Sequence, residues 1–231
     1  MRRTLAAVVG LLVAMSTFGT PAYASDDACR ALTDHTVRFP VGGAKHVVFA
    51  VAPDYGVTTV TVTECVRHGR KWQSVRQVDG WAGRAGFAPP GEKREGDGRT
   101  PSGSFTLTEA FGEGDPGTRL RYRQLHSTGD CWGSTVTDPR YNRYFSGTCG
   151  PDDEDLSAIM LSGPYQQAVV IDYNRRPVVP GDGSAIFFHV SSDKPTAGCI
   201  AVPLLDLTAI MRTLRPGDRM VMGISADLFR G

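Results

Sequence analysis

The sequence predicts a turn-rich, mainly β domain that contains one helix. Short runs of apolar and β-branched residues recur along the chain and are separated by turn signals. The 27 glycines and 15 prolines of the 231 residues lie between these runs rather than in one linker, which favours ordered β structure over disorder. Only residues 204–214 carry apolar side chains at a sustained helical spacing.

The first 24 residues are predicted to form a signal peptide. The pair Arg2-Arg3 precedes an apolar run over residues 5–15, and Ala22-Tyr23-Ala24 supplies a cleavage site of the small-x-small type. The apolar run is too short to span a membrane, and no second run of this kind follows. We therefore expect an exported protein, secreted or held in the cell wall, with no membrane span after the signal is removed.

The charge balance argues against a protein that binds nucleic acid. The formal net charge of +1 becomes −1 when the two arginines of the signal are removed, so no nucleic-acid partner is expected. The 207 residues that follow residue 24 are enough for one β-rich domain. We divide them into an N-terminal extension, residues 25–44, and a main domain, residues 45–231.

The first half of the main domain begins with three predicted strands. Residues 45–51 and 57–66 are predicted to form the first two. In the second of these, valine and threonine alternate strictly, as is typical of a strand. The turn signal Pro53-Asp54-Tyr55-Gly56 lies between them. A third strand over residues 72–78 completes an antiparallel meander.

The middle of the chain is expected to be less regular. Residues 84–103 are rich in glycine, proline and charge and are predicted to be a long surface loop, which a strand over residues 104–108 follows. Residues 113–151 show little periodicity and contain two cysteines. We interpret them as an irregular excursion, tied by a disulfide, that forms one wall of a cleft.

Two central strands and a helix are predicted near the C-terminus. Residues 167–173 and 185–190 are continuous apolar runs, as is typical of strands that are covered on both faces. Pro203 begins the helix over residues 204–214, and a last strand covers residues 219–224.

Of the five cysteines, four are expected to pair and one to remain free. An exported protein meets an oxidising environment, in which paired cysteines become disulfides. Among the three connectivities open to the other four, we favour Cys29–Cys65 and Cys131–Cys149, which leaves Cys199 unpaired. The first bridge would tie the extension to the main domain. The alternative is that Cys199 pairs and another thiol is free.

Cys199 and His189 are the candidate nucleophile and base. His189 ends an apolar strand, and nine residues with a Lys194-Pro195 turn separate it from Cys199, so the chain can fold back. A thiolate paired with an imidazolium would be a nucleophile at neutral pH. Taken singly, each residue is equally compatible with a buried structural role.

The residues before Cys199 suit a reacting carbonyl. Gly198 has no side chain to obstruct it, and the backbone N–H groups of Gly198 and Cys199 are candidate donors to an oxyanion. The Thr196 hydroxyl is expected to bind this turn or the substrate.

These residues resemble a known family, the L,D-transpeptidase catalytic domain (YkuD-like). Its signature is a His followed by a loop that ends in Ser/Thr-x-Gly-Cys, which here is His189 and Thr196-Ala197-Gly198-Cys199. Residues 99–105, with the letters RTPSGSF, are similar to its Arg-Thr-Pro-x-Gly-x-Phe segment, and residues 168–174 are similar to its central strand. The likeness covers residues 45–224. It implies a β-sandwich or barrel with the active site at the strand ends and one helix after the cysteine.

The resemblance also implies a function. Cys199 would attack a peptidoglycan tetrapeptide stem between the diamino acid and the terminal D-Ala, release D-Ala and form a thioester. The amine of a second stem would then form a 3-3 crosslink, whereas water would make the enzyme an L,D-carboxypeptidase. His189 would transfer the protons while the Val190 carbonyl orients it. No cofactor or metal is implied, the partners are peptidoglycan stem peptides, and we expect a monomer.

The chain departs from the family pattern at two positions. Ala197 and Ala201 stand where many members have a second His and an Arg or Asn. Three basic residues are candidates to bind the stem carboxylates instead: Arg84, Arg99 and Lys194.

Two other classes of protein were considered. A zinc-dependent wall peptidase could draw on four residues of metal-binding type, His126, Asp130, His189 and Cys199, but HxxxH, HExxH and CxxC spacings are missing from the sequence. A non-catalytic wall-binding module would need exposed aromatic side chains, for which the candidates are Trp72, Trp81, Trp132, Tyr141 and Tyr144.

Overall fold

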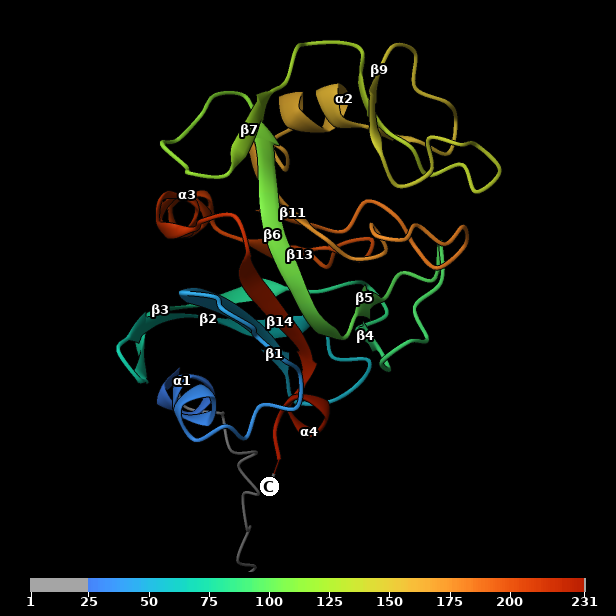
Figure 1. Cartoon of the computed structure of the whole chain (residues 1–231). Coiled ribbons are helices and arrows are strands. Elements are labelled where there is room, and N and C mark those ends of the chain that lie inside the picture. Colours follow the sequence, from blue (N-terminus) through green and yellow to red (C-terminus); the bar gives the residue numbers. More distant parts are fainter. Residues whose placement is uncertain (1–24, 231) are drawn as a thin grey trace, which may run out of the picture.

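A closed barrel is the centre of the computed structural model, which describes residues 25–230 (Figure 1). The predicted signal peptide, residues 1–24, lies outside the described residues. Nine strands form one sheet in the order β11-β12-β13-β3-β2-β1-β14-β6-β7, and pairing of β11 with β6 closes it. The strands are β1 (His46–Ala52), β2 (Thr59–His68), β3 (Lys71–Trp81), β6 (Gly103–Gly112), β7 (Arg121–Gln124), β11 (Gln167–Ile171), β12 (Phe187–Val190), β13 (Ile200–Val202) and β14 (Asp218–Ile224). The mainly β prediction is confirmed.

The predicted antiparallel meander is present as β1, β2 and β3. Val48 pairs with Glu64, and Val62 pairs with Val78. β3 continues to Trp81, three residues beyond the predicted end. On its other side β1 lies parallel to β14, so the last strand of the domain returns beside the first.

The two predicted central strands, β11 and β12, form the part of the barrel from which the site is built. Every residue of β12 is buried, and all residues of β11 except Gln167 are buried. β12 pairs antiparallel with β11 and parallel with β13, so that His189 lies between Ala168 and Ala201. β13 was not predicted, because its three residues are too few to show periodicity.

The prediction of a single helix is wrong. The predicted helix is present as α3 (Leu204–Thr213), but residues 25–230 contain three others: α1 (Ser25–Thr33), α2 (Leu156–Leu161) and α4 (Ser225–Leu228). α2 is capped by Asp155, whose carboxylate accepts the Ala158 N–H, and its six residues are shorter than two turns. Helices of this length give almost no periodic signal. No helix in the described part of the chain is long and apolar enough to cross a membrane.

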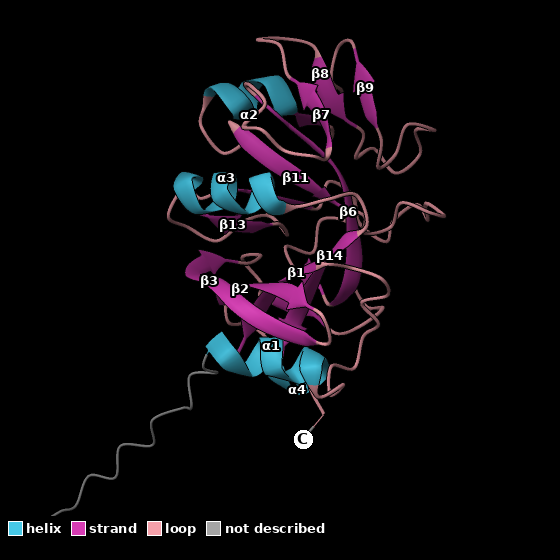
Figure 2. Cartoon of the chain, turned by 60° about the vertical axis from the view of Figure 1, so that its left-hand side comes forward, coloured by secondary structure: helices cyan, strands magenta, loops and turns pink. Residues whose placement is uncertain are grey.

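The described residues form a main core and two smaller cores, one beneath β1 and β2 and one that contains Cys199 and Tyr165. The main core contains apolar side chains of the barrel and of α3, among them Val48, Val169, Phe188 and Leu207. The core beneath β1 and β2 joins α1 and α4 to the sheet around Phe49, and both helices lie at the same end of the molecule (Figure 2).

The N-terminal extension is attached to the sheet by covalent and polar contacts. The predicted Cys29–Cys65 disulfide joins α1 to β2. The Thr33 hydroxyl, at the end of α1, accepts the Trp72 backbone N–H of β3 at 2.9 Å. α1 therefore packs beside β3, which pairs with β13 only at Trp81.

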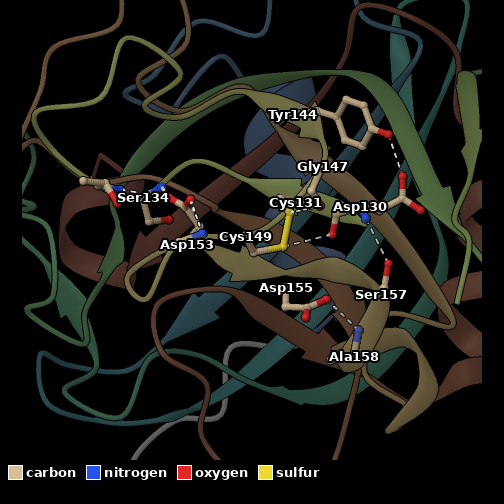
Figure 3. Close-up of a disulfide and its surroundings, with 12 residues drawn as sticks. Asp130, Cys131, Ser134, Tyr144, Gly147, Cys149, Asp153, Asp155, Ser157 and Ala158 are labelled. Carbon is tan, nitrogen blue, oxygen red and sulfur yellow. Dashed lines mark hydrogen bonds between the residues drawn. A yellow bond between two sulfur atoms is a disulfide. The ribbon is translucent and has the colours of Figure 1, made fainter. Parts of the chain in front are cut away.

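The excursion over residues 113–151 is more regular than predicted. It contains β7 and the strands β8 (Asp130–Trp132) and β9 (Tyr144–Ser146), and β8 also pairs with β10 (Glu154–Asp155). The predicted Cys131–Cys149 disulfide lies within it (Figure 3). Beside this bridge the Asp130 carboxylate accepts the Tyr144 hydroxyl at 2.5 Å. The predicted long loop likewise contains a parallel pair of two-residue strands, β4 (Phe87–Ala88) and β5 (Thr100–Pro101).

Replacing both Cys29 and Cys65 by alanine should lower the free energy of unfolding by about 3–4 kcal/mol, because the bridge spans 36 residues and its loss restores chain entropy to the unfolded state. Denaturant unfolding measures the change. The matched variant without Cys131 and Cys149, which span 18 residues, should lose about 3 kcal/mol. A loss below about 1 kcal/mol for the first pair would contradict the structural role of the extension.

Candidate active site

One cavity of about 370 Å³ brings the sequence-predicted residues together. It is lined by Cys199, His189, Gly198 and Thr196, which come from β12 and from the loop before β13. The excursion over residues 113–151 contributes Ser134 to the lining, and the residues directly after it contribute Asp152 and Glu154.

Cys199 is a buried, free thiol at the start of β13. Its side chain is 5% exposed, and it is the free cysteine of the described chain. The sulfur accepts the Phe187 N–H at 3.3 Å and donates to the Ala185 carbonyl at 3.3 Å. Burial, and to a smaller extent the Glu154 charge, raise the pKa of the thiol to about 12, although the Phe187 N–H acts in the opposite direction. Cys199 is therefore protonated at neutral pH.

His189 is a buried, neutral imidazole. Nδ1 lies 2.8 Å from the Val190 carbonyl oxygen, which can only accept, so Nδ1 carries the proton and Nε2 keeps its lone pair. Burial lowers the pKa of His189 to about 4, and the Val190 contact opposes that change. The contact between His189 and Val190 that the resemblance implied is thus present.

The thiol and the imidazole form a neutral pair rather than the expected ion pair. Both side chains line the same cavity, but among the described residues the thiol is hydrogen bonded to Phe187 and Ala185 and not to His189. A buried ion pair would lose more hydration than it gains here. The arrangement therefore suits proton transfer during attack on a substrate, with Nε2 as the acceptor.

Thr196 fixes the turn that carries the cysteine. Its hydroxyl donates to the Cys199 carbonyl at 2.8 Å and accepts the Gly198 N–H at 3.0 Å. Thr196 thus binds the turn, which is one of the two roles expected for it, the other being contact with the substrate. The Gly198 N–H has its partner within the turn, so it is not free to bind an oxyanion in this arrangement.

The Arg99-Thr100-Pro101 segment supports the same turn from the other side. The fully buried Thr100 hydroxyl donates to the Cys199 carbonyl at 3.2 Å and accepts the Gly83 N–H at 2.8 Å. A Cβ at Gly198, whose φ is +153°, would lie 2.9 Å from the Arg99 carbonyl oxygen. Glycine at 198 therefore allows the two backbones to approach, and the segment positions the turn that carries Cys199.

A match to a known family agrees with this geometry. The family described as the L,D-transpeptidase catalytic domain (YkuD) matches residues 56–222. The chain belongs to the L,D-transpeptidase catalytic domain family. No curated protein matches the sequence significantly.

Family membership accounts for the parts of the chain that build the cavity. The matched residues include the Arg-Thr-Pro segment, β11, β12 and the cysteine turn, whereas the extension, residues 25–44, lies outside the match. The chain is therefore an L,D-transpeptidase-type enzyme of a family that acts on peptidoglycan. The closed barrel is consistent with the fold of the family.

The charged lining of the cavity differs in part from the prediction. Arg84 and Lys194 line it as expected for carboxylate binding, whereas Arg99 is exposed and is not among the lining residues. Lys93 also lines the cavity and is 3% exposed, with its ammonium 2.7 Å from Asp97. Sequence reasoning missed Lys93, because a lysine in a charged, glycine-rich loop is usually solvated.

Two further residues that sequence reasoning missed are Tyr165 and Glu154. Tyr165 is 4% exposed, and its hydroxyl donates to Glu154 Oε2 at 2.8 Å. The ring meets the His189 imidazole edge-on, with 5.3 Å between centroids. Tyr165 precedes β11 in a turn without periodicity, so the sequence holds no signal for it.

The structure gives little support to the other two classes. His126 is 80% exposed and contacts Asp130 in the excursion, away from the cavity lining, and the described residues contain no group of three or more side chains that could hold a metal ion. Of the aromatic residues considered for wall binding, Trp132 and Tyr141 are buried and Trp72, Trp81 and Tyr144 are partly buried.

Replacing Thr100 by valine should lower the free energy of unfolding by about 1–3 kcal/mol, because the Gly83 N–H loses its acceptor inside the protein. Thr106→Val is a matched control, since that hydroxyl donates to the partly exposed Asp172. Thermal or denaturant unfolding gives both values. Equal, small losses in the two variants would show that the contact to the cysteine turn is not important for stability.

Proposed function

We propose that this protein is an exported peptidoglycan L,D-transpeptidase that forms 3-3 crosslinks through a Cys199 thioester. The observation that carries the proposal is the free Cys199 thiol in one cavity with the His189 imidazole, inside the domain that matches the family. A buried thiol beside a neutral imidazole is the pair that acyl transfer requires. Two disulfides are compatible with a secreted or cell-wall location.

In the acylation step the Cys199 sulfur attacks the stem carbonyl between the diamino acid and the terminal D-Ala. His189 Nε2 accepts the thiol proton and later gives it to the leaving D-Ala amine, so that a thioester forms and D-Ala leaves. The Val190 carbonyl holds the imidazole by its other nitrogen. Because the Gly198 N–H is engaged by Thr196, the Cys199 N–H is the nearer candidate for the oxyanion.

In the second step the neutral side-chain amine of another stem attacks the thioester carbonyl. The bond between carbon and sulfur breaks, and His189 transfers a proton from the amine to the Cys199 sulfur, so that the amide forms and the thiol is regenerated.

Two acidic side chains of the cavity lining, Glu95 and Asp152, attract the ammonium form of the acceptor before it loses its proton, whereas burial raises the pKa of the third, Glu154. This lining supports an amine rather than water as the acceptor. Arg84 and Lys194 on the same cavity surface supply positive charge for the stem carboxylates.

The domain division belongs to the same proposal. Residues 1–24 would direct export and be removed, residues 25–44 would form the attached extension, and residues 45–231 would form the catalytic domain. The Cys29–Cys65 bridge, which is compatible with an oxidising compartment, supports this division.

Incubation with disaccharide-tetrapeptide fragments, with the products measured by mass, tests the acceptor. Crosslinked dimers together with free D-Ala are the expected products. Tripeptides without dimers would show that water is the acceptor and that the enzyme is an L,D-carboxypeptidase. Unchanged fragments would contradict the proposed acyl donor.

Replacing Cys199 by alanine should reduce turnover by roughly three orders of magnitude or more, because the thioester can no longer form. The melting temperature should fall by no more than a few degrees, since the Phe187 N–H loses its contact with the sulfur but the backbone contacts of the turn remain. Cys131→Ala combined with Cys149→Ala removes two other cysteines and should keep the activity at a temperature where it is folded. Turnover retained by Cys199→Ala would overturn the assignment of the nucleophile.

A further inference from the structure

Tyr165 is held in place so that only its hydroxyl hydrogen can move. Its ring meets three other rings edge-on, with centroid distances of 5.5 Å to Phe111, 5.6 Å to Phe187 and 5.3 Å to His189. Close-packed aromatic edges of this kind leave a buried ring little freedom. The hydroxyl hydrogen, in contrast, can rotate about the bond between carbon and oxygen.

Two groups compete for that hydrogen. In the structure the Tyr165 hydroxyl donates to Glu154 Oε2 at 2.8 Å. Tyr165 lines the same cavity as Cys199 and packs in the same buried cluster, so its hydroxyl can reach the thiol, whose pKa it lowers. A phenol has a single hydrogen, so it can donate to the carboxylate or to the sulfur, but not fully to both.

The thiolate needs a donor that the resting site does not provide. In the resting state the sulfur donates to the Ala185 carbonyl and accepts the Phe187 N–H. Once the proton leaves, the sulfur faces the Ala185 oxygen without a hydrogen between them and keeps one donor. A buried anion with a single donor is costly, and the Glu154 charge increases the cost.

We propose that the Tyr165 hydroxyl turns from Glu154 to the Cys199 sulfur when the thiolate forms, and returns to Glu154 when the thioester has formed. The thiol proton goes to His189 Nε2, Tyr165 keeps its own proton throughout, and Glu154 gives up one hydrogen bond for the duration. Tyr165 is then a catalytic residue, because it touches the reacting sulfur, and Glu154 is its positioning residue. This inference rests on Cys199 being the nucleophile of the proposed function.

Four ionisable side chains surround the sulfur and must be considered in any test. Glu154 disfavours the thiolate, Lys93 and the Tyr165 hydroxyl favour it, and His189 shares the cavity as the proton acceptor. The two variants below change one of these groups each and leave the other three in place.

The test is the rate of Cys199 alkylation by iodoacetamide between pH 7 and pH 10, followed by intact mass. Tyr165→Phe keeps the ring contacts and should slow alkylation by roughly tenfold or more at each pH, because the thiolate loses a donor. Glu154→Gln keeps an acceptor but removes the charge, and should speed alkylation by roughly three- to tenfold. The decisive result is that the two variants change the alkylation rate in opposite directions.

Tyr144→Phe is the matched control, since Tyr144 also donates to a carboxylate, that of Asp130, but does not line the cavity. Its alkylation rate should equal that of the unmodified protein. A loosened cavity would speed alkylation in both Tyr165→Phe and Glu154→Gln, and that result, or unchanged rates in both, would overturn the proposal. If Tyr165→Phe does not fold, Glu154→Gln is tested by itself. Alkylation that is slower or unchanged in that variant then overturns the proposal.

Alkylation requires no peptidoglycan fragment, so the outcome is independent of the proposed function. Rates that move in opposite directions while every fragment remains unchanged would support the hydroxyl movement and count against the transpeptidase. Crosslinked products without opposite changes in the two alkylation rates would support the transpeptidase and count against the hydroxyl movement. In an active enzyme, Tyr165→Phe should lower kcat by roughly tenfold with KM nearly unchanged, since the donor acts on the thiolate and not on the bound substrate.

Discussion

The candidate site depends on one backbone carbonyl, that of Cys199, which accepts two threonine hydroxyls. Thr196 approaches it from within the cysteine turn, and Thr100 approaches it from the segment beside β5. Thr100 also accepts the Gly83 N–H, so the turn, the Arg-Thr-Pro segment and the end of β3 are linked through two atoms. The fixed carbonyl holds the backbone of Cys199, and the contacts of the sulfur with Phe187 and Ala185 hold its side chain at the cavity.

Burial explains why the pair of candidate catalytic groups is neutral at rest. The same apolar surroundings that raise the pKa of Cys199 lower that of His189, so one effect acts on both members with opposite sign. Charge separation must then coincide with substrate binding, which excludes water and adds new donors. A resting thiol of this kind is also less reactive toward oxidants than a thiolate, which suits an oxidising compartment.

The sequence predicts those parts of the fold that show a regular residue pattern, and its number of cysteines predicts that one of them is free. Alternation placed β2, continuous apolar runs placed β11 and β12, and the odd cysteine left Cys199 free. β13 and α2 were missed because three and six residues are too short for periodicity. Lys93, Glu154 and Tyr165 come from three separate segments with no pattern, and only the closure of the cavity brings them near the sulfur.

The contact between Thr33 and Trp72 places the extension beside an edge of the sheet that has little strand pairing. β3 pairs with β2 along its length but meets β13 only at Trp81, so one side of the strand lacks a strand partner over most of its residues. Such an edge is a template on which another chain can add a strand. α1 packs beside it and accepts one of its N–H groups, and the Cys29–Cys65 bridge keeps the helix there. The disulfide thus holds α1 beside a strand edge to which another strand could otherwise pair.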